Sequence, residues 1–298
     1  MAMNQSRATG YALMAVLCWS TVATAFKLAL VNLSPLQLLM IASTTASLFL
    51  LIILIWQGRV FELLRQPAKV YLKSVGFALL NPVLYYLILF SAYDQLPAQE
   101  AQALNYSWAI VLTLMAVPLL GHRLNVFDIV AAGVCYLGVL VIATRGALLS
   151  LDFSNGIGVA LALLSTLVWS LYWILSRKDE REPVLGLTLN FLFSLPVLMV
   201  IVGFAGQPVL IGLTGSLGAA FYAGLVEMGL GFLFWLLAMK AAANTSRIAN
   251  LIFLSPFLSL IFIALILGEP ILASTLIGLI LIVVGLVIQQ FRGVTLEE

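Results

Sequence analysis

The sequence predicts an all-α integral membrane protein of ten transmembrane helices, built as two inverted five-helix repeats with both termini in the cytoplasm. Of its 298 residues, 63% are hydrophobic and only 9% are charged, and the mean hydropathy is +1.15. Soluble globular domains carry roughly 25% charged residues. Because so few charges cannot cover a surface that faces water, we expect lipid to surround most of the chain. Hydropathy segments and the distribution of lysine and arginine then give the number and orientation of the helices.

Ten apolar segments are long enough to cross a bilayer. The hydrocarbon core is ~30 Å thick, and a helix needs about 20 predominantly apolar residues to span it. The predicted spans are 9–31, 35–56, 70–93, 98–119, 126–144, 156–176, 183–204, 212–238, 246–267 and 270–290.

Prolines mark the beginnings of several predicted spans. Ser34 is a suitable N-cap before Pro35, because serine accepts a hydrogen bond from the first turn and proline fits the first helical position. Pro97, Pro183 and Pro270 are expected to begin helices in the same way. Other prolines lie within spans, where they kink the helix and free backbone carbonyl groups.

Lysine and arginine lie almost entirely on one side of the predicted membrane. With the N-terminus in the cytoplasm, all but two of the 14 lysines and arginines fall on the cytoplasmic side. Arg145 lies on the opposite side, and Lys27 lies within the first span. Positive residues accumulate in cytoplasmic loops, so this bias favours the orientation. The cytoplasmic residues are Arg7, Arg59, Arg65, Lys69, Lys73, Arg123, Arg177, Lys178, Arg181, Lys240, Arg247 and Arg292.

Short motifs recur at a nearly constant spacing along the chain. Trp19-Ser20 recurs as Trp169-Ser170, an offset of 150 residues, and segment 138–146 resembles segment 285–293 at an offset of 147. Both of the latter segments end in Arg-Gly, and Arg145 is thus the counterpart of Arg292. The pattern predicts a duplication.

The duplication divides the chain into a first repeat, 1–149, and a second repeat, 150–298, within a single transmembrane unit. Because each repeat has an odd number of spans, the second enters the membrane from the opposite side. Inverted repeats allow two halves to exchange conformations around a site at the membrane midplane. The recurrence in mid-chain also argues against a cleaved signal peptide, which Ala23-Thr24-Ala25 would otherwise suggest.

Composition also limits the partners and the chemistry. The net charge of +2 and the lack of basic runs give no indication of nucleic-acid binding. Cys18 and Cys135 lie in apolar stretches and are expected to be free and buried, and the single histidine, His122, lies in a short polar break. We therefore expect no metal, no cofactor and no enzymatic activity. The expected partners are a small-molecule substrate and the lipid bilayer, with a monomer as the expected state.

Ionisable residues inside spans cost at least ~2.5 kcal/mol at the membrane centre, so each requires a reason. Glu227, in the eighth predicted span, either binds an ammonium group or a proton in a cavity, or is a structural acid bonded to a neighbouring helix. Gly224, Gly231 and Trp235 share its helical face. The residues considered for gating or coupling are Lys27, Glu100 and Glu227. Lys27 and Glu100 would form a gate pair; alternatively, Lys27 extends its charged end to the membrane surface and Glu100 lies at the interface.

Aromatic and amide side chains recur inside several spans at helical spacing. Each one alone is most simply explained by helix packing, but several of them together indicate an aromatic-lined cavity. The residues expected to line it are Trp19, Ser20, Thr24, Asn81, Tyr85, Gln102, Asn105, Tyr106, Trp108, Trp169, Trp173, Glu227, Trp235, Asn250 and Phe253.

The order and spacing of several motifs resemble the drug/metabolite transporter superfamily in its ten-helix EamA-type form. These motifs are Trp19-Ser20-Thr21, Trp169-Ser170, Ser255-Pro256 and Gly268-Glu269-Pro270. In addition, Asn105-Tyr106-Ser107-Trp108-Ala109 is similar to the Asn-Tyr-x-Trp-Pro segment of bacterial aromatic amino acid exporters (YddG-like), with Ala109 in place of the proline. The resemblance implies an inner-membrane exporter with a central cavity lined by the first, third, fourth, sixth, eighth and ninth helices.

We therefore expect export of amino acids, aromatic and other hydrophobic ones foremost, or of similar small metabolites, by alternating access. Glu227 and the amides would bind the polar ends of a zwitterion, and the aromatic walls would bind its side chain. A drug-cation efflux transporter, which would use the same carboxylate, is the alternative. A phosphate-ester carrier would need arginine or lysine at mid-membrane, and a membrane-embedded enzyme or a non-transporting scaffold protein is less favoured.

Overall fold

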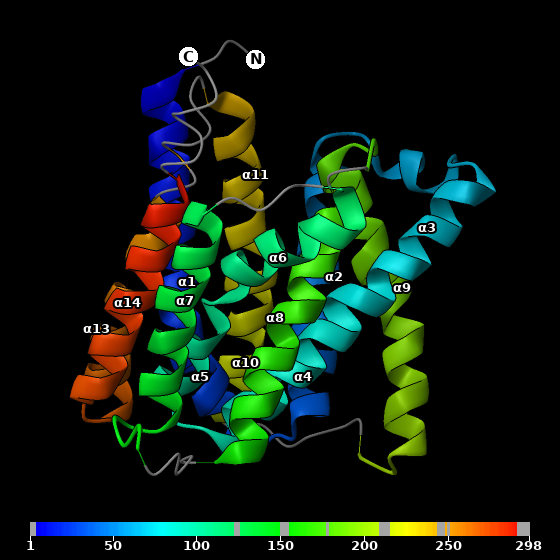
Figure 1. The fold of residues 1–298 in the computed structure, drawn as a ribbon. Coiled ribbons are helices and arrows are strands. Elements are labelled where there is room, and N and C mark those ends of the chain that lie inside the picture. The colour runs from blue at the N-terminus through cyan, green and yellow to red at the C-terminus, as the bar shows by residue number, and fades with distance from the viewer. Residues whose placement is uncertain are drawn as a thin grey trace, which may run out of the picture. The chain divides into compact units, whose positions relative to one another are not determined.

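A computed structural model describes residues 4–121, 126–149, 155–176, 179–208, 215–242, 248 and 251–290. Within these residues the regular secondary structure is helical throughout, as predicted (Figure 1). The elements are α1 (Gln5–Leu30), α2 (Pro35–Trp56), η1 (Val60–Leu64), α3 (Ala68–Ala78), η2 (Leu79–Leu84), α4 (Tyr85–Gln95), α5 (Ala98–Asn105), α6 (Trp108–Leu120), α7 (Val126–Ala143), α8 (Gly156–Ser176), α9 (Pro183–Phe204), α10 (Gly215–Tyr222), η3 (Ala223–Gly231), α11 (Phe232–Ala241), η4 (Leu251–Phe253), α13 (Leu254–Phe262), η5 (Ile263–Leu267) and α14 (Ala273–Gln290).

Eight helical stretches of the described chain are long and apolar enough to cross a membrane. They correspond to the first eight predicted spans. Two shorter apolar helices, Leu251–Leu267 and Ala273–Ile288, lie where the ninth and tenth spans were predicted. The chain is thus an all-helical, multi-pass membrane protein, while the count of ten spans and the cytoplasmic position of the termini stay predictions.

The chain folds into two compact units, each assembled from two separate stretches. The first unit contains residues 1–90 and 180–267, and the second contains 91–179 and 268–298. In the first unit, α1 packs against η3, α11 and α13, and α2 packs against α9. In the second unit, α14 packs against α7, and α8 packs against α5 and α6. Each unit therefore takes residues from both predicted repeats, whose boundary at 149/150 stays a prediction.

The predicted helix starts are confirmed at α2 and α9 and are wrong at the last span. Ser34 caps α2 by accepting a hydrogen bond from the Gln37 N–H group, and α9 begins at Pro183. In contrast, Pro270 lies outside α14, which begins at Ala273. The reason is the Gln99 side chain, which donates to the Pro270 oxygen at 2.8 Å and accepts from the Leu272 N–H group at 3.0 Å. These bonds hold the segment before α14 in a non-helical form.

Four of the predicted spans are interrupted rather than continuous, and the ninth predicted span combines η4, α13 and the π-helical segment η5. The third contains the π-helical segment η2, where Asn81 is extended (φ −146°, ψ 115°) and Pro82 lacks a backbone donor. The eighth contains the π-helical segment η3. The fourth is divided into α5 and α6 by a turn at Tyr106 and Ser107. Such interruptions free backbone groups and change the direction in which side chains point, and they are frequent at functional sites.

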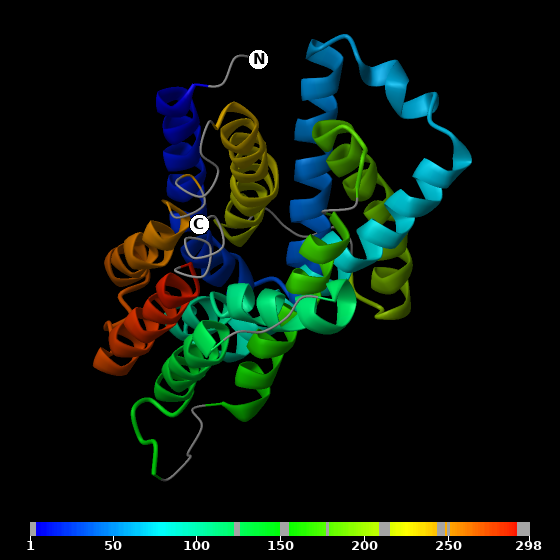
Figure 2. The same cartoon turned by 45° about the horizontal axis from the view of Figure 1, so that its top comes forward.

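The helices α7 and α14 lie side by side in the second unit (Figures 1 and 2) and approach at two reciprocal points. A Cβ atom on Gly138 would lie 2.5 Å from the backbone oxygen of Gly278, and one on Gly285 would lie 2.7 Å from that of Ala131. The 147-residue offset between the repeats relates Ala131 to Gly278 and Gly138 to Gly285. The same contact therefore occurs twice in an antiparallel pair, as a two-fold axis requires, which supports the proposed duplication.

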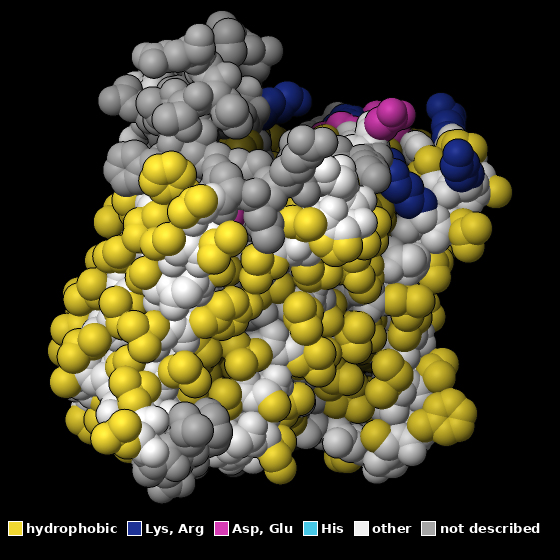
Figure 3. All heavy atoms as spheres, in the orientation of Figure 1, with side chains coloured by type: hydrophobic (Ala, Val, Ile, Leu, Met, Phe, Trp, Pro, Cys, Tyr) yellow, Lys and Arg dark blue, Asp and Glu magenta, His cyan; other side chains and the backbone are white. Residues whose placement is uncertain are grey.

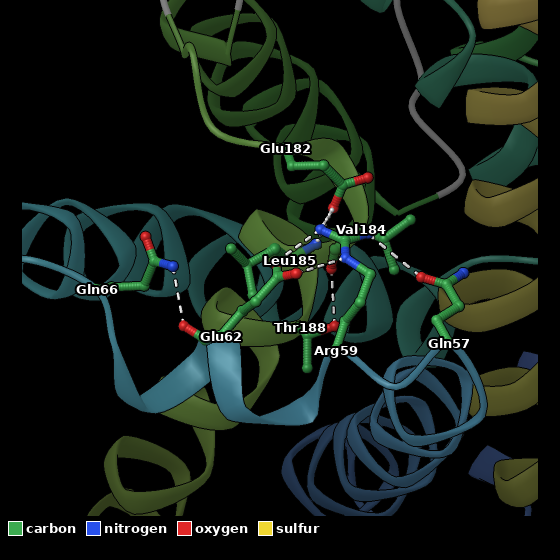
Figure 4. Close-up of polar contacts among 8 residues, drawn as sticks. All are labelled: Gln57, Arg59, Glu62, Gln66, Glu182, Val184, Leu185 and Thr188. Carbon is green, nitrogen blue, oxygen red and sulfur yellow. Dashed lines mark hydrogen bonds and ion pairs between the residues drawn. The ribbon is translucent and has the colours of Figure 1, made fainter. Parts of the chain in front are cut away.

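A loop network in the first unit joins the end of α2 to the start of α9 (Figure 4). Arg59 donates from Nε and Nη2 to the two carboxylate oxygens of Glu62 at 2.9 and 2.8 Å, and its Nη2 lies 3.5 Å from Glu182 Oε2. The same Glu182 oxygen accepts a hydrogen bond from the Leu185 N–H group at 2.8 Å, which caps α9. In Figure 3, charged side chains gather at the end where η1 and the start of α3 lie, whereas hydrophobic side chains cover most of the visible face.

Hydrogen bonds from Arg59 hold the pKa of Glu62 below its usual value, and those to Glu62 raise the pKa of Arg59. We predict that an Arg59→Gln substitution raises the pKa of Glu62 toward the ordinary value of about 4.3. The ion pair stabilises the folded loop at pH values above this ordinary pKa. The stabilisation is lost as the pH falls through the lower pKa that Glu62 has in the folded protein. A pH titration of isotope-labelled glutamate by NMR measures the change. Arg65→Gln is the matched control, and equal pKa values in both variants would contradict the assignment.

We also predict that Gly138→Ala lowers the stability of the detergent-solubilised protein by ~1–3 kcal/mol, because the new methyl group forces the α7 and α14 backbones apart. Denaturation followed by circular dichroism measures the loss. Gly133→Ala is the control on the same helix, since a Cβ atom there would meet no atom of another helix within 4 Å. Equal stability of the two variants would mean that the close approach does not stabilise the pair.

Candidate functional site

The carboxylate of Glu227 lies in the π-helical segment η3 of the first unit. Tyr86, which is fully buried, donates its hydroxyl group to Glu227 Oε1 at 3.0 Å. The other oxygen, Oε2, is shielded from solvent and has no hydrogen-bond partner among the residues that the structure describes. Part of the Glu227 side chain nevertheless remains exposed. The acid is thus held on one side by a phenol and keeps a second oxygen that is able to bind a donor.

The Nε1 edge of the Trp19 indole packs against Gly231 of η3. A Cβ atom on Gly231, four residues after Glu227, would lie 2.7 Å from Trp19 Nε1, so only glycine leaves room for the ring. The Trp19 ring centroid lies 5.5 Å from that of Trp235 and 6.1 Å from that of Phe232. The space beside Gly231, which was predicted to share a helical face with Glu227, is therefore occupied by the Trp19 side chain of α1.

Further buried polar groups of the first unit lack partners. Asn81 is only 1% exposed, and neither its amide oxygen nor its amide nitrogen has a hydrogen-bond partner in the described part of the chain; the same holds for the hydroxyl of Thr24. Buried polar groups are normally hydrogen-bonded, so these are groups that a polar ligand could satisfy. The ring of Tyr85 packs on that of Tyr86, with centroids 4.8 Å apart.

In the second unit, predicted site residues meet where α5 gives way to α6. Asn105, the last residue of α5, donates to the Ser165 hydroxyl at 2.9 Å. The Ser170 hydroxyl donates to the backbone oxygen of Trp108, the first residue of α6, also at 2.9 Å. Two hydroxyl groups of α8 thus bond to the interrupted helix on either side of its turn. Gln102 is buried one turn earlier, and its Oε1 atom has no partner within the described residues.

Four aromatic rings form a cluster beside this turn. Trp169 stacks on Tyr172, with centroids 5.5 Å apart and an interplanar angle of 20°. Trp108 and Trp173 meet Trp169 edge-on at 6.5 and 5.7 Å. Trp108, Trp169 and Trp173 are all partly exposed, so the cluster presents indole surface rather than being sealed in the core.

Glu100 is bound within the second unit. The Arg145 Nε atom lies 2.8 Å from Glu100 Oε1, and the Glu100 side chain is completely buried while that of Arg145 is half exposed. Arg145, the one arginine predicted to lie on the side opposite the cytoplasm, is thus the partner of a buried acid. Lys27 belongs to the first unit and is partly exposed, and its pairing with Glu100 stays a prediction.

The remaining predicted residues have varied surroundings. Ser20 is buried and donates to the backbone oxygen of Val16 at 2.6 Å, so its hydroxyl is used within α1. Tyr106 and Phe253 are partly exposed, and Asn250 lies outside the described residues. Because the predicted residues are divided between the two units, their convergence on one cavity stays a prediction.

Tyr86 and Ser165 bind predicted site residues but were not predicted themselves, and Arg145 was not predicted as the partner of Glu100. Asn81 and Tyr85 were assigned to one face on the assumption of a regular helix, but η2 interrupts the repeat of about 3.6 residues, and the acid is bonded by Tyr86 instead. Pro82 was the available signal, since a proline within a span indicates a break in periodicity. Ser165 lies in an otherwise apolar stretch, and its position in sequence does not indicate a partner.

Comparisons with known proteins give one family model that matches most of the chain. The model of the EamA-like transporter family matches residues 7–144 and 156–289. Among curated proteins, an uncharacterized transporter of Clostridium kluyveri is 28% identical over 64% of this chain, which spans 63% of that relative's length. The aromatic amino acid exporter YddG of Ancylobacter novellus is 25% identical over 80% of this chain and 81% of its own.

Two further proteins are similar to this chain. The uncharacterized transporter YvbV of Bacillus subtilis is 26% identical over 80% of this chain and 77% of its own. A protein of known crystal structure has the same fold, with a TM-score of 0.68 and 23% identity over 99% of this chain and 100% of its own.

The bond from Tyr86 to Glu227 gives a prediction about stability. Removing a hydrogen bond to a charged or buried acid costs roughly 1–3 kcal/mol, so Tyr86→Phe should destabilise the detergent-solubilised protein by about that amount. Tyr222→Phe is the control, because the Tyr222 hydroxyl lies at an exposed position and bonds to the neutral Thr21 hydroxyl rather than to an acid. Thermal denaturation of both variants measures the difference, and an equal or larger loss in the control would contradict the assigned role of Tyr86.

Proposed function

Since the chain belongs to the EamA-like transporter family and is a multi-pass membrane transporter, we propose that it exports amino acids across the bacterial inner membrane. Aromatic and other hydrophobic amino acids are the foremost substrates, and similar small amphipathic metabolites belong to the same chemical class. The similarity to a protein described as an aromatic amino acid exporter over 80% of the chain supports this choice.

The observation that carries the proposal is the Glu227 carboxylate of the first unit, whose Oε2 atom has no hydrogen-bond partner among the described residues. An amino acid presents an ammonium group, a carboxylate and a side chain. Glu227 Oε2 is an acceptor for the ammonium group, and the neighbouring Trp19 offers a flat apolar surface to an aromatic side chain. The unpartnered Asn81 amide provides both a donor and an acceptor for the polar end.

Alternating access between two inverted repeats is the proposed mechanism. The reciprocal contact of α7 with α14 supports such a duplication. So do the glycines that end predicted spans at the same offset of 147, Gly121 and Gly268, whose φ angles are +71° and +69°. Interrupted helices in both units would allow backbone groups at mid-membrane to contact a substrate. The termini are proposed to lie in the cytoplasm, as the loop charges indicate.

A drug-cation efflux transporter is the second candidate, and the same Glu227 carboxylate favours it. The two functions differ in the substrate's carboxylate, which an amino acid has and a drug cation lacks. Competition between these compounds therefore separates them.

We predict that the full chain, reconstituted in proteoliposomes, transports labelled phenylalanine or tryptophan and that other hydrophobic amino acids compete. Glu227→Gln should lower the transport rate by at least tenfold or change its pH dependence without changing the circular dichroism spectrum. Glu180→Gln, which neutralises an exposed acid, is the matched control. Competition by drug cations alone would favour efflux of cations, and no transport of any of these compounds would contradict the proposal.

A further inference from the structure

We propose that the connection from α2 to α3 in the first unit is a binding site for an anionic phospholipid. Arg65 and Lys69 bind the phosphate of the headgroup, and exposed apolar side chains beside them pack against the first part of the acyl chains. The lipid is bound in addition to any transported substrate, so the inference does not depend on the proposed export of amino acids.

The connection joins two candidate membrane spans and carries a marker of the membrane surface. Helix α2 ends at Trp56, and the next long apolar stretch begins at Ala68. Trp56 is 84% exposed, and tryptophan is enriched where a membrane meets water. Residues 57–67 are therefore expected to lie beside the lipid headgroups.

The short helix η1 within this connection has two different sides. A 3-10 helix has three residues per turn, so side chains three positions apart lie on the same side. Leu63 is buried in a cluster with Leu54 of α2 and Leu185 of α9. In contrast, Phe61 and Leu64, which are three positions apart, are 65% and 79% exposed. Two large apolar side chains on one exposed side indicate an apolar partner outside the chain.

The exposed side of α3 begins with a basic residue and continues with apolar ones. Lys69, Leu72 and Leu79 are all exposed, and their spacing of three and seven residues places them on one side of the helix. In Figure 3, lysine and arginine side chains lie next to hydrophobic ones at the end where η1 and the start of α3 lie. A helix that enters a membrane from its surface presents such a sequence of groups to a lipid, with the charge at the headgroup.

Positive charge is in excess on the same segment. Residues 59–73 include four basic residues and one acidic residue, Glu62. Both carboxylate oxygens of Glu62 accept hydrogen bonds from Arg59, so the acid is already neutralised. Arg65 and Lys69 are exposed, and neither forms an ion pair with another residue that the structure describes. These two charges are therefore available to an anion from outside the chain.

Hydrogen bonds fix the corner between η1 and α3. The Tyr71 hydroxyl donates to the backbone oxygen of Leu63 at 2.8 Å and accepts from the Gln66 N–H group at 3.2 Å. The Gln66 side chain donates to the backbone oxygen of Glu62 at 2.9 Å (Figure 4). The basic residues on either side of Gln66 are thus carried by an ordered corner, which can hold one headgroup rather than attract anions in general.

The combination of groups selects an anionic lipid over a soluble anion. A free phosphate would gain from the basic side chains but not from the apolar ones, and a zwitterionic lipid would gain mainly from the apolar ones. Lysines and arginines next to a membrane span attract anionic headgroups, and apolar side chains beside them insert at the boundary between headgroups and acyl chains. Phosphatidylglycerol satisfies both halves of the site.

Native mass spectrometry of the purified full chain in detergent tests the site, with phosphatidylglycerol and phosphatidylcholine of identical acyl chains as probes. We expect phosphatidylglycerol to bind roughly tenfold more tightly, because each basic side chain at an anionic surface contributes about fivefold to binding. The double variant Arg65→Gln/Lys69→Gln should weaken phosphatidylglycerol binding roughly 10- to 30-fold and leave phosphatidylcholine binding unchanged. Arg7→Gln/Lys240→Gln, which removes two exposed charges elsewhere in the first unit, is the matched control.

A second pair of substitutions tests the apolar half of the site separately. Phe61→Ser/Leu64→Ser should weaken the binding of both lipids roughly threefold to tenfold, because apolar surface that contacts the acyl chains is lost. The preference for phosphatidylglycerol should remain, since both basic residues are still present. Val31→Ser/Phe204→Ser is the control, because Val31 and Phe204 are also large exposed apolar residues of the first unit.

Three results would overturn the inference. Equal binding of the two lipids to the wild type would mean that the surface does not recognise a charged headgroup. An equal loss in the two charge variants would mean that net charge, and not the corner between η1 and α3, attracts the lipid. Displacement of phosphatidylglycerol by an equal concentration of inorganic phosphate would identify a site for a soluble anion.

Discussion

A bilayer offers no hydrogen-bond partner to a polypeptide, so each polar group inside it must be satisfied by the protein or by what the protein binds. This constraint explains why regular secondary structure in the described chain is helical, and why hydroxyl groups such as that of Ser20 bond to their own helix. It also makes the exceptions informative. Three of these exceptions, Glu227, Asn81 and Gln102, keep buried polar atoms without partners among the described residues and lie in or next to a place where a helix is interrupted.

Two kinds of packing hold the helices of each unit together. Between α7 and α14, small residues let backbones approach directly, which compensates for the lack of a hydrophobic driving force between helices in lipid. In the first unit, aromatic rings fill the spaces instead, as at Trp19 and at Tyr86, whose ring packs 5.3 Å from that of Phe90. Rigid surroundings matter for the acid, since a carboxylate recognises a ligand only if its orientation is fixed.

Eight of the spans and the Ser34 cap could be predicted from sequence, because they depend on local composition. Length and hydropathy are sufficient for a helix in lipid, Ser34 is sufficient for a cap, and a charge such as Glu227 is conspicuous among apolar residues. Contacts between distant segments were not predictable. The bond from Tyr86 to Glu227 joins residues 141 positions apart across a π-helical irregularity, and the pairing of Glu100 with Arg145 depends on how α5 and the end of α7 meet.

The reciprocal contact between α7 and α14 has a consequence for the origin of the chain. In the proposed duplication, α7 and α14 descend from one ancestral segment. Residue 138 of α7 lies against the copy of residue 131 in α14, and residue 131 of α7 lies against the copy of residue 138. Such a surface is complementary to itself, so a single five-helix polypeptide could have used it to pair with a second, oppositely inserted copy. Fusion of the two genes would then have preserved an older dimer interface as an internal one. The present Ala131 and Gly278 are one pair of positions at which the two copies differ.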